Sequence, residues 1–191
     1  MSTIVVAKKN KEIVIGGDTL IKYGSIKLKA GFTKDTSKII RVGDSYIATC
    51  GNAVVNLILK NYFNNLDELP NLNSIDNIFE MACNLHVVLK EKYYLNPNEE
   101  ADDAYESSRM DCLIANQHGI FGLDAYRYVE EYTSYAAYGS GHKFALGAMK
   151  VAYEQGFTAE EVVNFGLEAA AEYDDGTDKP FDIFKMVSDE D

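Results

Sequence analysis

The chain has 191 residues, of which 47% are hydrophobic, 25% are charged and only three are proline. This composition is typical of a compact globular protein with a substantial core, and we expect one domain over residues 1–191. The formal net charge of −12 makes nucleic acids and anionic membrane surfaces unfavourable partners, because like charges repel. No apolar run in the sequence is long enough to cross a bilayer.

The first half of the chain predicts two β-hairpins followed by two helices. Two β-branched runs, at residues 4–7 and 13–17, flank a polar turn and predict a hairpin close to the amino terminus. A second hairpin is predicted over residues 38–49, with its turn at Gly43-Asp44. Apolar residues at three- and four-residue intervals then predict one helix from about residue 51 and another after Ser74.

The second half predicts strands, a tyrosine-rich connection, two helices and a last strand. Strands are expected at residues 110–115 and 119–123, after an acidic loop, and residues 124–139 are expected to form a turn-rich link. Helices are expected from about His142 to Gln155 and from Thr158, and a strand at 181–186. Strand groups alternating with helix pairs indicate an α+β fold, in which two sheets stack face to face with helices outside.

Cysteine and histidine spacing gives no sign of a metal centre. The three cysteines are odd in number and widely separated, which favours reduced core residues in a cytoplasmic protein. The three histidines form no pair with the spacing of a zinc site. These residues are Cys50, Cys83, Cys112, His86, His118 and His142.

The amino terminus carries the strongest indication of chemistry. If Met1 is removed, Ser2 presents a hydroxyl group and a free α-amine on one residue, which are the nucleophile and general base of an N-terminal nucleophile hydrolase. A free α-amine has a pKa of about 7.7–8.0, and a nearby cation lowers that value. Lys38 is the candidate cation, and Asp18 at the end of the second strand is the carboxylate that would hold it.

Several motifs in this order resemble the proteasome β-subunit and HslV-like family. They are Met-Ser-Thr-Ile-Val-Val-Ala at the start, Val-Ile-Gly-Gly-Asp ending at Asp18, the Ser37-Lys38-Ile39 step, Tyr138-Gly139-Ser140-Gly141 before a small-residue-rich helix, and the helix start Thr158-Ala159-Glu160-Glu161. The resemblance implies a four-layer αββα sandwich and a threonine-type peptidase.

The resemblance also implies roles for single residues. Ser2 stands where the family has its terminal nucleophile, usually threonine, and Asp18 and Lys38 match the residues that tune the terminal amine. Ser140 matches the serine that hydrogen-bonds near that amine. Asp174 matches either the aspartate that supports this network or a cation site after the penultimate helix.

Two further roles are implied less directly. Thr177 would share the turn of Asp174, so a structural cation such as Na⁺ is expected there and no other cofactor. The family's oxyanion donor is a backbone N–H group after the second hairpin, so we expect it from Thr49, with Gly51 as the alternative. Taken singly, Asp18 is an ordinary turn residue, Lys38 a surface lysine and Ser140 a helix N-cap; together they indicate a hydrolase site.

The predicted function is therefore a peptidase subunit that cleaves peptide bonds with Ser2, within a cytoplasmic homo-oligomeric ring that an AAA+ unfoldase supplies with substrate. Two alternatives stay open. The chain is a catalytically silent ring or scaffold subunit if Met1 is retained, because an acylated α-nitrogen cannot act as a base. An amidase of the same fold acting on a small amide is the other.

Overall fold

A computed structural model describes residues 2–98 and 103–189 of the chain. Met1, part of the acidic segment (99–102) and the last two residues lie outside the described residues, so predictions that concern them are not addressed by the fold. None of the helices in the described part of the chain combines the length and apolar character that crossing a bilayer requires.

The first sheet holds the amino-terminal strand at its centre. Its four antiparallel strands lie in the order β10, β1, β2, β11. Their bounds are Tyr135–Gly139 for β10, Thr3–Lys9 for β1, Glu12–Asp18 for β2 and Phe181–Val187 for β11. Because β1 pairs on both sides, the start of the chain is held by backbone hydrogen bonds rather than left loose.

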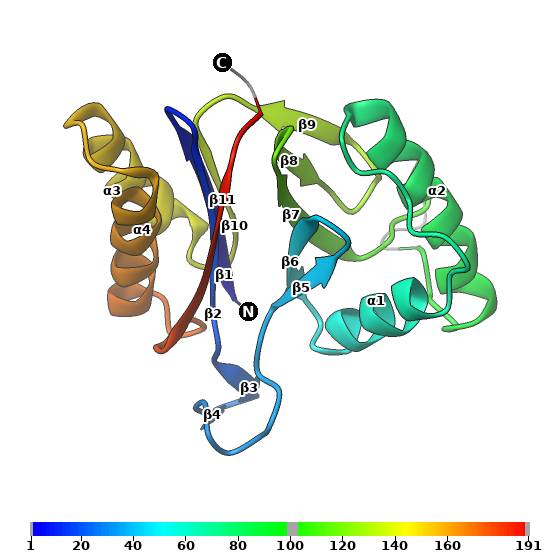
Figure 1. Ribbon diagram of the computed structural model, residues 1–191. Coiled ribbons are helices and arrows are strands. Elements are labelled where there is room, and N and C mark those ends of the chain that lie inside the picture. The colour runs from blue at the N-terminus through cyan, green and yellow to red at the C-terminus, as the bar shows by residue number, and fades with distance from the viewer. Residues whose placement is uncertain (1, 99–102, 190–191) are drawn as a thin grey trace.

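The second sheet has five antiparallel strands in sequence order, and a small hairpin extends beyond both sheets (Figure 1). The five strands are β5 (Ile39–Val42), β6 (Ser45–Gly51), β7 (Met110–Asn116), β8 (Gly119–Leu123) and β9 (Val129–Tyr132). The small hairpin consists of β3 (Ile21–Tyr23) and β4 (Ile26–Leu28).

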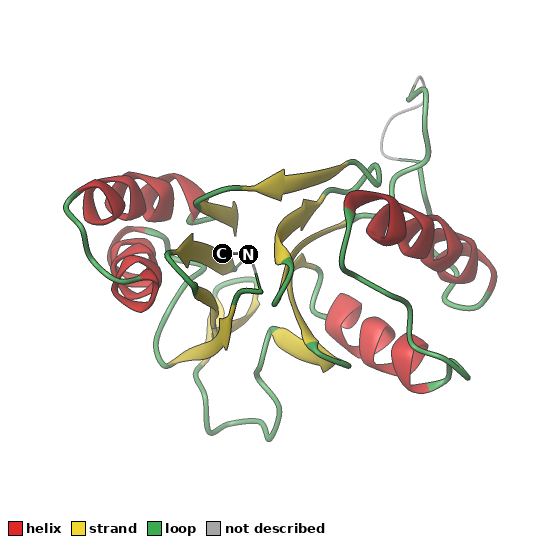
Figure 2. Ribbon diagram, turned by 45° about the horizontal axis from the view of Figure 1, so that its top comes forward, coloured by secondary structure: helices red, strands yellow, loops and turns green. Residues whose placement is uncertain are grey.

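Four helices cover the outer faces of the two sheets (Figures 1 and 2). Helices α3 (His142–Glu154) and α4 (Ala159–Tyr173) pack on the first sheet, and α1 (Val54–Asn64) and α2 (Ile75–Glu91) pack on the second. A third apolar cluster, including the fully buried Ile4 and Leu113, fills the space between the sheets. The predicted four-layer αββα sandwich is confirmed.

Local sequence signals set the helix ends. Ser74 accepts a hydrogen bond from the backbone N–H of Asn77 and caps α2. Thr158 and Glu161 form the predicted capping box at the start of α4. Gly156 follows α3 with a φ of +91°, a conformation in which a residue without Cβ is unstrained.

The prediction of a turn-rich link over residues 124–139 is wrong in its second half. Strands β9 and β10 form there, and β10 pairs with β1 at the edge of the first sheet. Tyr132 and Tyr138 are half-buried between the sheets, where their hydroxyl groups lie 2.9 Å apart, whereas Tyr135 packs on the outer face against Tyr153 of α3. Turn-forming residues at Asp124 and Ser134 dominate the local pattern, whereas aromatic residues favour strands once a neighbouring strand is available.

Candidate active site

The β1–β10 pairing places Ser2 against Ser140. The backbone N–H of Ser140 donates to the Ser2 carbonyl at 2.8 Å, and the Ser2 N–H donates to Ser140 Oγ at 3.2 Å. Gly139, with a φ of +96°, makes this approach feasible, because a Cβ on it would lie 2.0 Å from the Ser2 carbonyl oxygen. Ser2 is only 5% exposed, and these two hydrogen bonds hold its main chain in place.

The β1–β2 pairing places Asp18 beside the same terminus. One oxygen of this fully buried carboxylate accepts hydrogen bonds from the Thr3 N–H at 2.8 Å and from Lys38 Nζ at 2.6 Å. The other accepts from the Leu20 N–H at 3.0 Å. The expectation that Asp18 returns to the start of the first strand and holds Lys38 therefore agrees with the geometry.

Burial acts on both charges of this pair. It lowers the pKa of the Lys38 ammonium, and the nearby Asp18 carboxylate opposes part of that shift. Burial likewise raises the pKa of Asp18, against the effects of Lys38 and of the two backbone donors. A lysine whose charge is costly to maintain exchanges its proton more readily than a solvated one, which is a common feature of catalytic sites.

A chain of hydroxyl groups links Ser2 to Asp174 at the end of α4. Ser140 Oγ lies 2.7 Å from Asp174 Oδ2, and Thr177 Oγ1 lies 2.6 Å from the same oxygen. The hydroxyl of Thr3 lies 2.6 Å from that of Thr177. Ser2 and Thr3 are therefore each connected to Asp174 through one hydroxyl group, Ser2 through that of Ser140 and Thr3 through that of Thr177.

The donor and the acceptor of each hydrogen bond between these hydroxyl groups can be assigned by starting from Asp174. A carboxylate only accepts hydrogen bonds, so Ser140 and Thr177 each donate their single hydroxyl proton to it. Ser140 can then act only as the acceptor for the Ser2 N–H, and Thr3 donates to Thr177. The Ser2 nitrogen is the donor in this contact, so its lone pair is not used. Once the amine is free, that lone pair is available to act as a base.

These contacts suit a hydroxyl chain better than a cation site. Asp174 Oδ2 already accepts two hydrogen bonds, and Thr177 Oγ1 takes part in two. Within residues 2–98 and 103–189 there is also no group of three histidine, cysteine, aspartate or glutamate side chains that could hold a metal ion. The side chains of Asp174 and Thr177 thus do not present a free ligand pair, and the structural cation stays a prediction.

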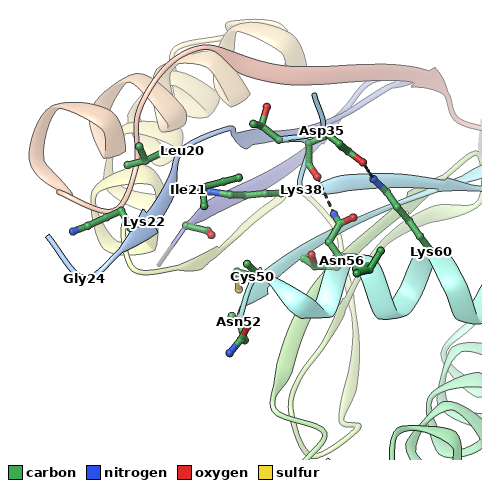
Figure 3. A pocket seen from close by; sticks show the side chains of 17 residues that line it. Leu20, Ile21, Lys22, Gly24, Asp35, Lys38, Cys50, Asn52, Asn56 and Lys60 are labelled. Carbon is green, nitrogen blue, oxygen red and sulfur yellow. Dashed lines mark hydrogen bonds and ion pairs between the residues drawn. The ribbon is translucent and has the colours of Figure 1, made fainter. Parts of the chain in front are cut away.

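A cavity of about 360 Å³ opens beside Ser2 (Figure 3). Strand β3 and the residue before it supply one wall, residues 35–38 another, and the end of β6 with the start of α1 the third. Lys38 and Cys50 both line this cavity with Ser2. The site therefore has a nucleophile candidate, a buried ion pair and space for a substrate in one place.

The expected oxyanion donor, Thr49, is engaged elsewhere. Its N–H donates to the Lys38 carbonyl at 2.9 Å as β6 pairs alongside the start of β5, so the expectation for Thr49 is wrong. Successive backbone N–H groups of a strand point to opposite edges, which directs the Gly51 N–H to the same edge as that of Thr49. At that point β5 has not begun, and Gly51 lines the cavity instead.

Three contributors to the site were missed by reasoning from the sequence: Thr3, Gly139 and Cys50. Thr3 could have been identified from the alternation of side chains along the first strand, because neighbouring residues in a strand face opposite sides. Cys50 is 6% exposed, and burial raises its pKa to about 12, so its thiol stays protonated at neutral pH. It forms part of the wall and is no rival to Ser2 as a nucleophile.

The chain is similar in sequence to a proteasome subunit and to an HslV subunit, although no family model matches it. A proteasome subunit beta of Nanoarchaeum equitans is 27% identical over 180 residues, covering 88% of this chain and 83% of the relative. The ATP-dependent protease subunit HslV of Rickettsia typhi is 28% identical over 174 residues, covering 90% and 87%.

Solved structures match over nearly the whole chain. Thiobacillus denitrificans BPH in complex with epoxomicin is 46% identical, with a TM-score of 0.92 and coverage of 98% of this chain and 100% of that one. Eukaryotic HslV from Trypanosoma brucei, at 16% identity, has a TM-score of 0.68 over 97% and 99% of the two chains, a likeness in fold alone.

Proposed function

The chain belongs to the proteasome β-subunit and HslV-like family of peptidases, and we propose that it cleaves peptide bonds with Ser2, made the first residue by removal of Met1, inside an oligomeric ring. The observation that carries this proposal is the double connection of Ser2. Its nitrogen contacts the Ser140–Asp174 hydrogen-bond series, and it shares a cavity with Lys38, whose ammonium is held by the buried Asp18.

The reaction uses both functional groups of Ser2. Its hydroxyl oxygen attacks the scissile carbonyl while its own α-amine takes the hydroxyl proton, and the same amine then protonates the departing amine. Cleavage leaves an ester between Ser2 and the acyl part of the peptide. A water molecule, deprotonated by the amine, hydrolyses this ester and restores the hydroxyl group.

The surrounding residues adjust the amine and the oxyanion. A cationic Lys38 disfavours protonation of a nearby amine, and Asp18 holds Lys38 in place. The Gly51 N–H is the proposed donor to the oxyanion that forms on the attacked carbonyl, and one such donor is worth roughly a hundred- to a thousandfold in rate.

Mass spectrometry of the protein from its native host tests the proposal directly. We expect a mass lacking Met1 and a single adduct at Ser2 after treatment with a β-lactone. Ser2→Ala should abolish both the adduct and hydrolysis of a fluorogenic peptide, whereas Ser134→Ala, in the turn before β10, should change neither. An intact Met1 would overturn the proposal in favour of a silent ring subunit.

We propose further that the ring consists of identical chains and that an AAA+ unfoldase feeds it. Large apolar side chains are exposed on the outer helices, as expected where neighbouring subunits pack; examples are Phe79, Val87, Phe144 and Val151. The Rickettsia typhi relative is named an ATP-dependent protease subunit, which supports an energy-dependent partner. Light scattering of the purified chain tests the ring, and a monomeric mass would contradict it.

Two smaller proposals concern location and cofactors. The three cysteines are free thiols, which supports a reducing compartment, and we propose the cytoplasm. We also propose that catalysis needs no cofactor, since the reaction above draws its nucleophile and base from one residue. Unchanged peptide hydrolysis after exhaustive treatment with a chelator, in a buffer that retains Na⁺, is the expected result.

A further inference from the structure

The charge of this protein is distributed unevenly around the cavity. Residues 19–60 contain seven lysines and arginines but only two carboxylates, a net charge of +5. The rest of the chain has eleven cationic residues and twenty-eight carboxylates, a net charge of −17. The segment that supplies most of the cavity walls is therefore cationic within a strongly anionic protein.

The walls of the cavity have the same sign. Three of the lining residues are lysines, Lys22, Lys38 and Lys60, and one is a carboxylate, Asp35 (Figure 3). Lys38 is held by Asp18, and Lys22 is held by Asp175 at 2.6 Å with only 9% of its side chain exposed. These two lysines are committed to contacts outside the cavity, which leaves Lys60 as the lining cation that a ligand can reach.

Lys60 lines the cavity from α1, and the carboxylate with which it pairs is exposed to solvent. It lies on α1 one turn after Asn56, whose side-chain amide donates to the Ser37 carbonyl at 2.9 Å and fastens the helix to the opposite wall. The Lys60 ammonium pairs with Asp35, whose side chain is 62% exposed. Such an exposed pair contributes little stability, and an ammonium has three N–H donors, so a second carboxylate can bind there.

The segment that contributes two of the walls carries further exposed cations. Lys27 and Lys34 are exposed between β3 and β5, near the lining residues Gly24 and Asp35 in the sequence. Neither forms an ion pair with a carboxylate in the described parts of the chain, although Lys27 acts electrostatically on Asp175 and Asp178. Clustered cations of this kind attract anionic ligands, while the surrounding anionic surface repels them from other faces.

We propose that this cavity selects peptides with an acidic side chain, aspartate or glutamate, at the residue whose carbonyl Ser2 attacks, and that Lys60 is the specificity-determining residue. The inference rests on the proposed function, because it takes Ser2 as the point of attack. The side chain next to the attacked carbonyl must enter the cavity that contains Ser2, and its carboxylate meets the Lys60 ammonium at the α1 wall.

The test compares two matched peptides, N-acetyl tripeptide aminocoumarin amides that end in Glu or in Gln, for binding to the assembled Ser2→Ala protein. We expect the Glu peptide to bind roughly two- to fivefold more tightly at low salt, and the difference to shrink in 0.5 M NaCl. Lys60→Gln should abolish the preference. Lys150→Gln, which removes an exposed, ion-paired lysine from α3, should retain it.

A second variant keeps the test decisive if Lys60→Gln disturbs folding. Asp35→Asn removes the carboxylate that competes for Lys60 and should increase the preference for Glu. Equal binding of both peptides, no binding of either, or an undiminished preference in Lys60→Gln would overturn the inference. Hydrolysis of the same peptides by the protein with Ser2 intact tests the proposed function separately, since binding to Ser2→Ala needs no catalysis.

Discussion

Lys38 Nζ lies 2.6 Å from Asp18 Oδ1, and the carboxylate of this pair has no exposed surface. The same oxygen accepts the N–H of Thr3, so the ion pair and the start of the chain share one atom. Any change in this pair therefore acts on the position of Thr3, the residue after the proposed nucleophile, as well as on the local charge.

Replacing Asp18 with Asn should lower the free energy of unfolding by about 3–5 kcal/mol near neutral pH, because it leaves a buried ammonium without a counter-charge. The loss should shrink as pH rises. Lys38 in the folded variant binds its proton less tightly than in the unfolded chain, so stability increases with pH between the two pKa values. Urea unfolding at pH 7 and pH 9.5 measures this, and a loss independent of pH would contradict it.

A control for this variant is Glu154→Gln, which breaks the exposed Lys150–Glu154 pair on α3. Because both partners are solvated, we expect no measurable change in stability at either pH.

Replacing Ser140 with Ala should reduce kcat for a fluorogenic peptide by roughly ten- to a hundredfold with little change in KM, because the Ser2 nitrogen loses its acceptor while the cavity walls stay in place. The measurement is steady-state hydrolysis by protein shown by mass spectrometry to lack Met1. Ser134→Ala serves as the matched control and should retain the full rate. A rise in KM alone would show that Ser140 acts on binding instead.

Replacing Gly139 with Ala should destabilise the protein, since the new Cβ would lie 2.0 Å from the Ser2 carbonyl oxygen at a φ of +96°. We expect a cost of at least about 1–3 kcal/mol and a loss of peptidase activity as β1 is displaced. Gly147→Ala offers the opposite outcome, because no atom lies within 4 Å of its Cβ. That variant should be more stable by about 0.5–1 kcal/mol; thermal unfolding compares the two.

Alkylation should distinguish the three thiols of the native protein. Burial raises the pKa of Cys50 to about 12, and Cys112 is also buried, so at pH 8 iodoacetamide should modify the half-exposed Cys83 first. Peptide mapping of labelled protein checks the order, and unfolding in urea should make all three react. Rapid modification of Cys50 in the folded protein would contradict its place as a protonated wall residue.

Much of the candidate site was predictable because its residues stand at the ends of recognisable elements. Asp18 ends a strand that pairs with the first, so a hairpin alone brings it to Thr3. Thr49 was the wrong choice of oxyanion donor because the partner of a backbone N–H depends on how two strands align, and the alignment with Lys38 is not encoded in either strand by itself.

The sequence by itself determined the four helices, the first two hairpins and the order of these elements, since apolar periodicity, the capping box at Thr158 and the glycine at 156 act over a few neighbouring residues. Strands β9 and β10 were not among the predicted elements, because they form only where neighbouring strands are available. It also marked Ser2 as a residue with two usable groups. Only the tertiary structure decided which side chains meet. The contact between Ser2 and Ser140 joins residues 138 positions apart, and it exists because β1 and β10 pair at the edge of one sheet. Contacts of that separation depend on the packing of the whole sandwich, which no local pattern specifies.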